Sequence, residues 1–149
     1  MKKFKFKFDI LLRIKEEKEK EAKEKYGSEL QKKTTLEIEN ERLKKDLINY
    51  ENKYLQSKGR GDKLEFEDIM LFNNYSEAVN LRIVNNNKKI VEIDENLIKL
   101  KEEFLQAMKE KKMFEKLKDK REKAYLKSAK KIIEKRIEDI AILRYTNKK

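Results

Sequence analysis

Residues 79–114 read VNLRIVNNNKKIVEIDENLIKLKEEFLQAMKEKKMF, and this stretch decides the fold of the chain. Steps of four and three residues from Val79 reach eleven positions, of which nine are apolar, while the residues between them are mostly Glu, Lys, Asn and Asp. These positions are Val79, Ile83, Asn86, Ile90, Ile93, Leu97, Leu100, Phe104, Ala107, Lys111 and Phe114. Apolar residues at this spacing form the seam of a coiled coil on an α-helix. After Phe114 the apolar residues continue without a strict register.

A second, weaker seam runs through the first half of the chain. Its apolar members are Phe8, Leu12, Ala22, Tyr26, Leu36, Leu43, Leu47, Tyr50 and Tyr54. The same phase also meets the polar residues Lys15, Glu19, Glu29, Lys33 and Asn40. We therefore expect a helix whose two ends pack well and whose middle packs poorly.

The segment between the two seams, SKGRGD at 57–62, holds two of the three glycines in the chain. Gly59 suits the left-handed position that ends a helix, and Asp62 followed by Glu65 resembles a capping box that opens the next helix. Two helices joined by a few residues pack antiparallel. The sequence therefore predicts an all-α fold, a long two-helix antiparallel coiled coil, or helical hairpin.

We expect the hairpin to form a single domain over residues 1–149. Its expected parts are a helix at about 5–58, a turn at 59–62 and a second helix at about 63–145. Two positions leave an alternative open. Gly27 is either tolerated in a continuous helix or marks a stop and restart, and Asn85–Asn87 either fix the register or bend the second helix within 73–87.

The composition excludes several classes of protein. The chain has 149 residues, of which 46% are charged, and it lacks Pro, Cys, His and Trp. Without Cys and His it cannot build a disulfide, a thiolate metal site or a Ser-His-Asp arrangement. It also lacks a glycine-rich phosphate loop, so we expect no enzyme, no cofactor and no metal. Low hydrophobicity favours disorder, but the absence of proline and the spaced apolar residues oppose it.

The chain has no uncharged apolar stretch long enough to span a membrane. Its first residues are too charged for a signal peptide. We therefore expect a cytosolic protein without a membrane span.

Basic residues concentrate near both ends of the sequence. Residues 2–20 carry eight basic and four acidic residues, and residues 109–136 carry thirteen and five, whereas residues 21–108 carry sixteen and eighteen. In an antiparallel hairpin the two ends lie together and form one basic pole, which attracts acidic partners. The alternative is a solvated, lysine-rich surface without a partner.

Aromatic and apolar residues gather on both sides of the expected turn. They are Leu47, Tyr50, Tyr54, Phe66, Phe72 and Tyr75. Exposed Tyr and Phe side chains are favoured anchors for protein partners. Local packing at the end of the hairpin is an equal alternative, and stacking on nucleic acid is a third.

Several segments resemble one known family. They are MKKFKFKF at 1–8, LLRIKEE at 11–17, LINY at 47–50, Tyr54, Tyr75, Val79, MFEKLK at 113–118 and EDIA at 138–141. These segments are similar to the FliJ family of flagellar export proteins, and the similarity runs from end to end of the chain.

The resemblance implies a non-enzymatic coiled-coil component of the flagellar type III export apparatus, similar to the stalk subunit of rotary ATPases. The implied partners are the hexameric export ATPase, an export-gate membrane protein and export chaperones. The implied location is cytoplasmic and peripheral, at the cytoplasmic face of the inner-membrane export apparatus. The alternatives are an injectisome stalk protein of the same architecture and a basic coiled coil that binds nucleic acid.

The resemblance also assigns two sets of partner-binding residues. The terminal basic pole that would enter the ATPase ring comprises Lys2, Lys3, Lys5, Lys7, Arg13, Arg136 and Arg144. The set that would contact the export gate or a chaperone comprises Leu47, Tyr50, Tyr54, Tyr75 and Val79.

Overall fold

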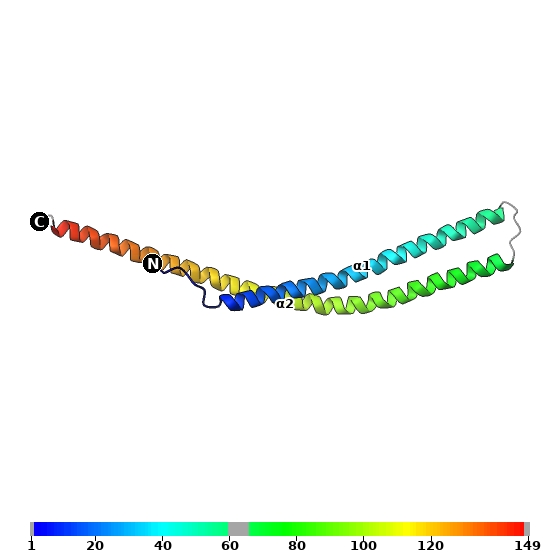
Figure 1. Cartoon of the computed structure of the whole chain (residues 1–149), viewed down its shortest axis with the longest axis horizontal. Coiled ribbons are helices and arrows are strands. Elements are labelled where there is room, and N and C mark those ends of the chain that lie inside the picture. The colour runs from blue at the N-terminus through cyan, green and yellow to red at the C-terminus, as the bar shows by residue number, and fades with distance from the viewer. Residues whose placement is uncertain (1, 60–65, 148–149) are drawn as a thin grey trace. The chain divides into compact units, whose positions relative to one another are not determined.

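Two long helices make up nearly all of the structure (Figure 1). The computed structural model describes residues 2–59 and 66–147. Helix α1 spans Asp9–Gly59 and helix α2 spans Phe66–Asn147, and the described residues include no strand. The all-α helical hairpin expected from the sequence is confirmed.

Helix α1 begins at Asp9, later than the expected start at about residue 5. The preceding residues, in which Lys and Phe alternate, lie outside the helix, and the Asp9 backbone N–H donates to the Phe6 carbonyl at 3.1 Å. A carboxylate in the first turn is favourable because it faces the positive end of the helix dipole. The helix therefore starts where an acidic residue first becomes available.

The two open positions lie inside continuous helices. Helix α1 passes through Gly27, and α2 passes through Asn85–Asn87. Gly59 is the last residue of α1. The remainder of the expected turn and the capping box of Asp62 and Glu65 lie outside the described residues.

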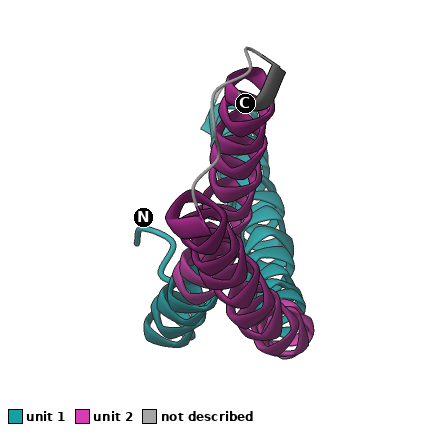
Figure 2. Ribbon diagram, turned by 90° about the vertical axis from the view of Figure 1, so that its right-hand side faces the viewer, with its two compact units in different colours: residues 1–22, 104–149 teal, residues 23–103 magenta. Residues whose placement is uncertain are grey.

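The contacts divide the chain into two compact units (Figure 2). Unit 1 comprises residues 1–22 and 104–149, and unit 2 comprises residues 23–103. In unit 1, Asp9 pairs with Lys118 and Lys15 pairs with Glu110. Because the partner number falls as the α1 number rises, the helix segments of this unit are antiparallel.

Unit 2 has the same arrangement, as its cross-helix contacts show. Lys33 pairs with Asp94, and Glu39 pairs with Arg82, so the helix segments of this unit are also antiparallel.

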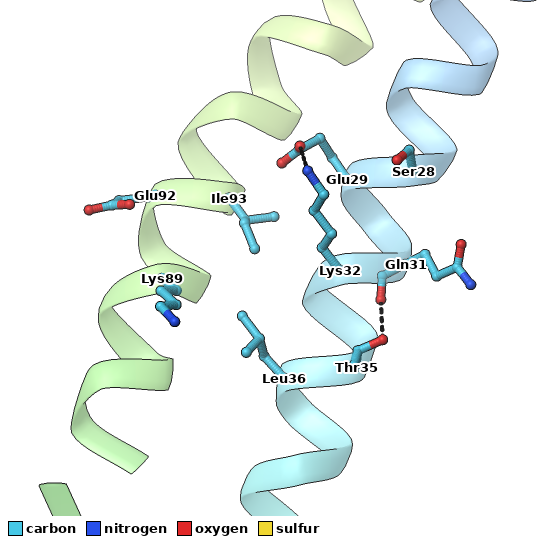
Figure 3. Close-up of a pocket in the computed structure, with 9 residues that line it drawn as sticks. All are labelled: Ser28, Glu29, Gln31, Lys32, Thr35, Leu36, Lys89, Glu92 and Ile93. Carbon is cyan, nitrogen blue, oxygen red and sulfur yellow. Dashed lines mark hydrogen bonds and ion pairs between the residues drawn. The ribbon is translucent and has the colours of Figure 1, made fainter. Parts of the chain in front are cut away.

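The seams predicted from the sequence form the contact between the helices. All eleven positions of the 79–114 seam are buried or half-buried, and most residues between them are exposed. Val79 and Leu12 keep only 4% of their surface exposed. In unit 2, Leu36 and Ile93 point into the space between the helices, beside a groove of about 540 Å³ (Figure 3).

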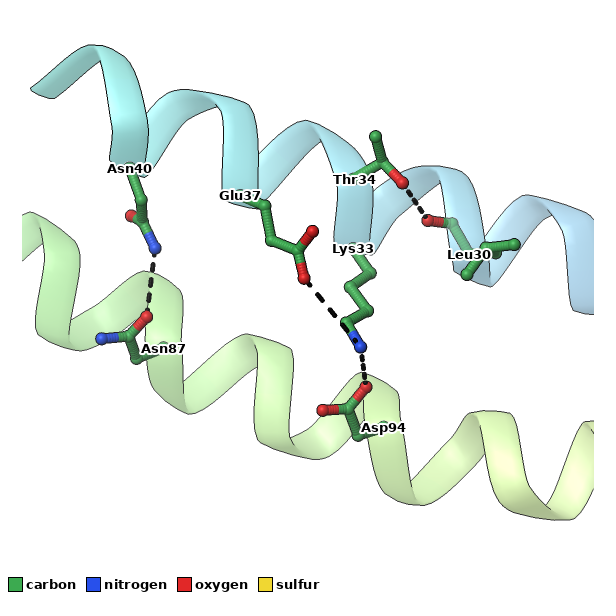
Figure 4. A network of polar contacts seen from close by, with 7 residues as sticks. All are labelled: Leu30, Lys33, Thr34, Glu37, Asn40, Asn87 and Asp94. Carbon is green, nitrogen blue, oxygen red and sulfur yellow. Dashed lines mark hydrogen bonds and ion pairs between the residues drawn. The ribbon is translucent and has the colours of Figure 1, made fainter.

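Polar residues in the α1 seam meet polar partners on α2 (Figure 4). The Asn86 amide donates to Oδ1 of Asn40 at 2.9 Å, and the Asn40 amide donates to Oδ1 of Asn87 at 3.0 Å. Asn86 and Asn40 are 1% and 6% exposed, and throughout the described residues every buried side-chain nitrogen and oxygen has a partner. A buried asparagine finds hydrogen-bond partners in one register of the two helices only. The asparagine layer, which consists of Asn40, Asn86 and Asn87, therefore fixes the alignment of the helices in unit 2.

Replacing Asn86 by Ala removes the donor to Asn40 and leaves a buried acceptor without a partner. We expect the free energy of unfolding, measured by urea denaturation, to fall by about 1–3 kcal/mol. The double variant Asn40→Leu/Asn86→Leu leaves no unpaired buried acceptor, so it should recover most of the lost free energy of unfolding. The neighbouring exposed variant Asn85→Ala is the control. If Asn86→Ala costs no more than the control, the asparagine layer does not fix the register.

Candidate protein-interaction surfaces

Residues 2–8, which we call the N-terminal strap, pack on α2 through their phenylalanines. The Phe8 ring lies 6.5 Å from that of Phe114, and the Phe4 ring lies 5.6 Å from that of Tyr125, measured between centroids. Phe6 contacts Phe8 edge-on and is only 8% exposed. The Tyr125 hydroxyl donates to the carbonyl of Lys2. The beginning of the chain is therefore attached to α2 within unit 1.

Two charged contacts add to this attachment. The guanidinium of Arg121 lies 5.0 Å from the Phe8 ring centroid, which is a cation–π geometry. The ammonium of Lys118 lies 3.5 Å from a carboxylate oxygen of Asp9. The last residue of the strap and the first residue of α1 are thus both anchored on α2.

The phenylalanines of the strap pack inward, while its lysines stay in solvent. Lys2, Lys3, Lys5 and Lys7 are all exposed. Arg13 is also exposed, although it pairs with Asp9 on its own helix at 3.4 Å. The structure thus brings the strap lysines and Arg13 into one unit as exposed groups.

Unit 1 carries all of the excess positive charge of the chain. Its residues include 24 basic and 12 acidic side chains, a net charge of +12, whereas unit 2 has 16 basic and 17 acidic, a net charge of −1. Arg136 and Arg144 also belong to this unit and are exposed on α2. All seven predicted residues of the basic pole therefore lie in unit 1, although Arg136 and Arg144 lie on α2 beyond Tyr125, which contacts the strap. We call the seven residues the terminal basic surface.

Helix α2 continues well beyond the residues that contact the strap. In residues 126–147, which we call the α2 extension, every residue except Ala129 is exposed. Its exposed large apolar side chains include Leu126, Ile132, Ile133, Ile137, Ile140, Ile142 and Leu143.

The aromatic residues near the expected turn form a cross-helix cluster in unit 2. Phe72 stacks on Tyr50 at 5.6 Å and on Tyr54 at 5.2 Å, and Tyr75 lies 5.0 Å from Tyr50. Val79, from the predicted gate or chaperone set, is buried in the seam. The cluster is thus local packing for most members, while Tyr50 remains 39% exposed.

Sequence reasoning missed two residues that organise these surfaces, Arg121 and Tyr125, which hold the strap. Phe72 was recognised among the aromatic residues near the turn but was left out of the gate or chaperone set, and it is the centre of the aromatic cluster. The alternation of Lys and Phe in residues 2–8 was an available signal, because alternating polarity indicates an extended segment with one packed side.

Ion pairs between the helices shift the pKa of their members. In unit 1, a hydrogen bond from Lys15 at 2.9 Å lowers the pKa of Glu110, and one to Glu19 at 2.6 Å raises the pKa of Lys111. These pairs hold the first turns of α1 against α2. They therefore support the part of the chain that carries the strap.

The pKa values of three further groups in unit 2 are shifted by hydrogen bonds in the same way. A hydrogen bond to Asp94 raises the pKa of Lys33. Hydrogen bonds from Lys32 and Arg82 lower the pKa of Glu29 and of Glu39. Each shift favours the charged form of the group.

These shifts predict how stability depends on pH. A carboxyl whose pKa is lowered on folding stabilises the fold above its unfolded pKa, and the contribution is lost as pH falls through the folded value. A lysine whose pKa is raised stabilises the fold below its unfolded pKa, and the contribution is lost as pH rises through the folded value. We therefore expect the melting temperature to decrease when the pH falls below the ordinary pKa of glutamate. We expect it to decrease again when the pH rises above the ordinary pKa of lysine.

In Glu110→Gln the melting temperature should depend less on pH in the acid range than it does in the unmodified chain. The control is Glu102→Gln, an exposed position eight residues earlier on α2, which should keep the pH dependence of the unmodified chain. Equal profiles for the two variants would contradict the assignment of Glu110.

The described residues contain neither a metal site nor a membrane-spanning segment. In residues 2–59 and 66–147, no group of carboxylates is placed to hold a metal ion. In the same residues, neither helix contains a segment that is both apolar and long enough to cross a bilayer.

Comparison with known proteins gives one match. The family described as Flagellar FliJ protein matches residues 4–149, which is essentially the whole chain. No curated protein and no solved structure matches the chain. The resemblance noted in the sequence is confirmed, and the chain belongs to the FliJ family of coiled-coil components of flagellar protein export.

Proposed function

We propose that this chain is a non-enzymatic coiled-coil component of the flagellar type III export apparatus that associates with the hexameric export ATPase. In that role it resembles the stalk of a rotary ATPase and links the ATPase to the export gate and to export chaperones. Family membership over residues 4–149 carries this proposal. Because the family is a flagellar one, it favours flagellar export over the injectisome alternative.

The terminal basic surface supports the contact with the ATPase. It belongs to the unit with a net charge of +12, and its strap lysines are exposed on a backbone that the phenylalanines fix to α2. A basic surface of this kind accelerates encounter with an acidic annular partner and orients it. Exposed charge pairs contribute little affinity, which suits a stalk that must remain mobile in its ring.

The aromatic cluster supports a separate contact with the export gate or a chaperone. Leu47 and Val79 pack in the seam and position the tyrosines. Tyr50, which is 39% exposed and lies beside the half-buried Tyr54 and Tyr75, offers an anchor for a partner. We assign the partner contact to these three tyrosines and a supporting role to Leu47 and Val79.

This function places the protein in the cytoplasm, at the cytoplasmic face of the inner-membrane export apparatus. Nucleic acid is not among its partners in this proposal. Binding of single strands needs stacking aromatics that are exposed within a basic groove. Here the phenylalanines of the basic unit pack inward on α2, and the aromatic cluster belongs to a unit with a net charge of −1.

Charge reversal of the strap tests the contact with the ATPase. We expect the triple variant Lys3→Glu/Lys5→Glu/Lys7→Glu to bind the isolated hexameric export ATPase at least about tenfold more weakly at low salt, mainly through a slower association rate. Biolayer interferometry over a salt series measures both rate and affinity.

The matched control is Lys45→Glu/Lys53→Glu/Lys88→Glu, which changes the net charge equally at exposed positions of unit 2. It should bind like the unmodified chain. If the strap variant binds the ATPase as tightly as this control, the terminal basic surface is not the ATPase contact.

A further inference from the structure

The α2 extension has two chemically different sides. Projected on a helix of 3.6 residues per turn, seven aliphatic residues fall within an arc of about 140°. They are Leu126, Ala129, Ile132, Ile133, Ile137, Ile140 and Leu143. The opposite arc carries most of the lysines and all three acidic residues of the extension, together with Ile142. We call the first side the aliphatic face.

Two arginines interrupt the aliphatic face. Arg136 lies one turn from Ile132 and one turn from Ile140, and Arg144 lies one turn from Ile140. In a dry protein seam, these guanidinium groups would need buried partners, because an unpaired buried charge is strongly unfavourable. At a lipid surface the same groups extend to the headgroups, where phosphate accepts two hydrogen bonds from a guanidinium.

The net charge of the extension also indicates which kind of partner can cover the aliphatic face. Residues 126–147 hold six basic and three acidic residues, a net charge of +3. A second copy of the extension would bring like charges together, whereas an anionic bilayer attracts each Lys and Arg near its surface. The strap adds to this attraction, because the Lys2 carbonyl is bound by Tyr125, directly before the extension.

We propose that the α2 extension is an interfacial amphipathic helix that lies on an anionic phospholipid surface with its aliphatic face in the acyl boundary. Helices of this kind combine a lysine-rich polar side with exposed Ile and Leu side chains on the other. The binding needs neither the ATPase nor the export gate, so it goes beyond the function proposed above. Because Arg136 and Arg144 also belong to the terminal basic surface, a lipid surface and the ATPase compete for these two residues and do not hold them at the same time.

Sedimentation of the full chain with lipid vesicles tests the proposal. Vesicles that contain phosphatidylglycerol should retain the chain, and vesicles of phosphatidylcholine alone should retain far less. Added salt should weaken the retention because it screens the attraction of Lys and Arg. Absence of binding to phosphatidylglycerol vesicles overturns the proposal.

Two isoleucines of the extension provide a matched pair of variants. Ile140, on the aliphatic face, is 52% exposed, and Ile142, on the polar side, is 60% exposed. Ile140→Ser should weaken binding to phosphatidylglycerol vesicles about tenfold, because one large aliphatic side chain no longer enters the bilayer. Ile142→Ser should bind like the unmodified chain, and neither change touches a buried side chain.

Several results contradict the proposal. If Ile140→Ser keeps full binding, the attraction is electrostatic adsorption and the aliphatic face is not used. If Ile142→Ser loses as much as Ile140→Ser, the face is assigned wrongly. If Ile140→Ser weakens binding to the ATPase while vesicles retain no chain, a protein covers the face. The vesicle assay contains no ATPase, so its failure is distinct from failure of the proposed function.

Discussion

The structure depends on matching polar residues between the two helices. A two-helix seam of aliphatic residues alone is satisfied by several registers, because each heptad resembles the next. Here Asn86 donates to Asn40 in unit 2, and Glu110 and Lys111 accept and donate opposite Lys15 and Glu19 in unit 1. Each pair has its partner in one alignment only. The polar residues therefore determine which part of α1 faces which part of α2.

Much of the fold was predictable from the sequence. The heptad spacing from Val79 to Phe114 predicted the buried side of α2, because a helix with seven-residue apolar periodicity must bury that side. The sparse seam of the first half was harder to interpret. Residues such as Lys33 and Glu19 were expected to weaken packing, and their partners Asp94 and Lys111 on α2 become visible only when the helices are aligned. Pairing over long separations is a property of the fold, not of either segment.

The start of the chain shows a second limit of sequence reasoning. The sequence predicted a helix from about residue 5, but α1 begins at Asp9 because the alternating phenylalanines favour an extended strap that packs on one side. The basic pole was predictable because charge counts do not depend on local conformation. The sequence did not show that the basic pole consists of a strap attached to α2 and an exposed extension of α2. This division follows from the contacts of Phe4 with Tyr125 and of Phe8 with Phe114, which only the structure reveals.

Attachment of the strap to α2 is the central claim, since it brings the beginning of the sequence beside residues more than a hundred positions later. Pulsed electron resonance between spin labels at cysteines replacing Phe8 and Phe114 tests it most directly, because the native chain has no cysteine. The structure predicts a narrow, short distance that corresponds to the 6.5 Å ring separation plus the two label linkers. A long or broad distance, as in a chain whose two ends do not pair, would contradict it.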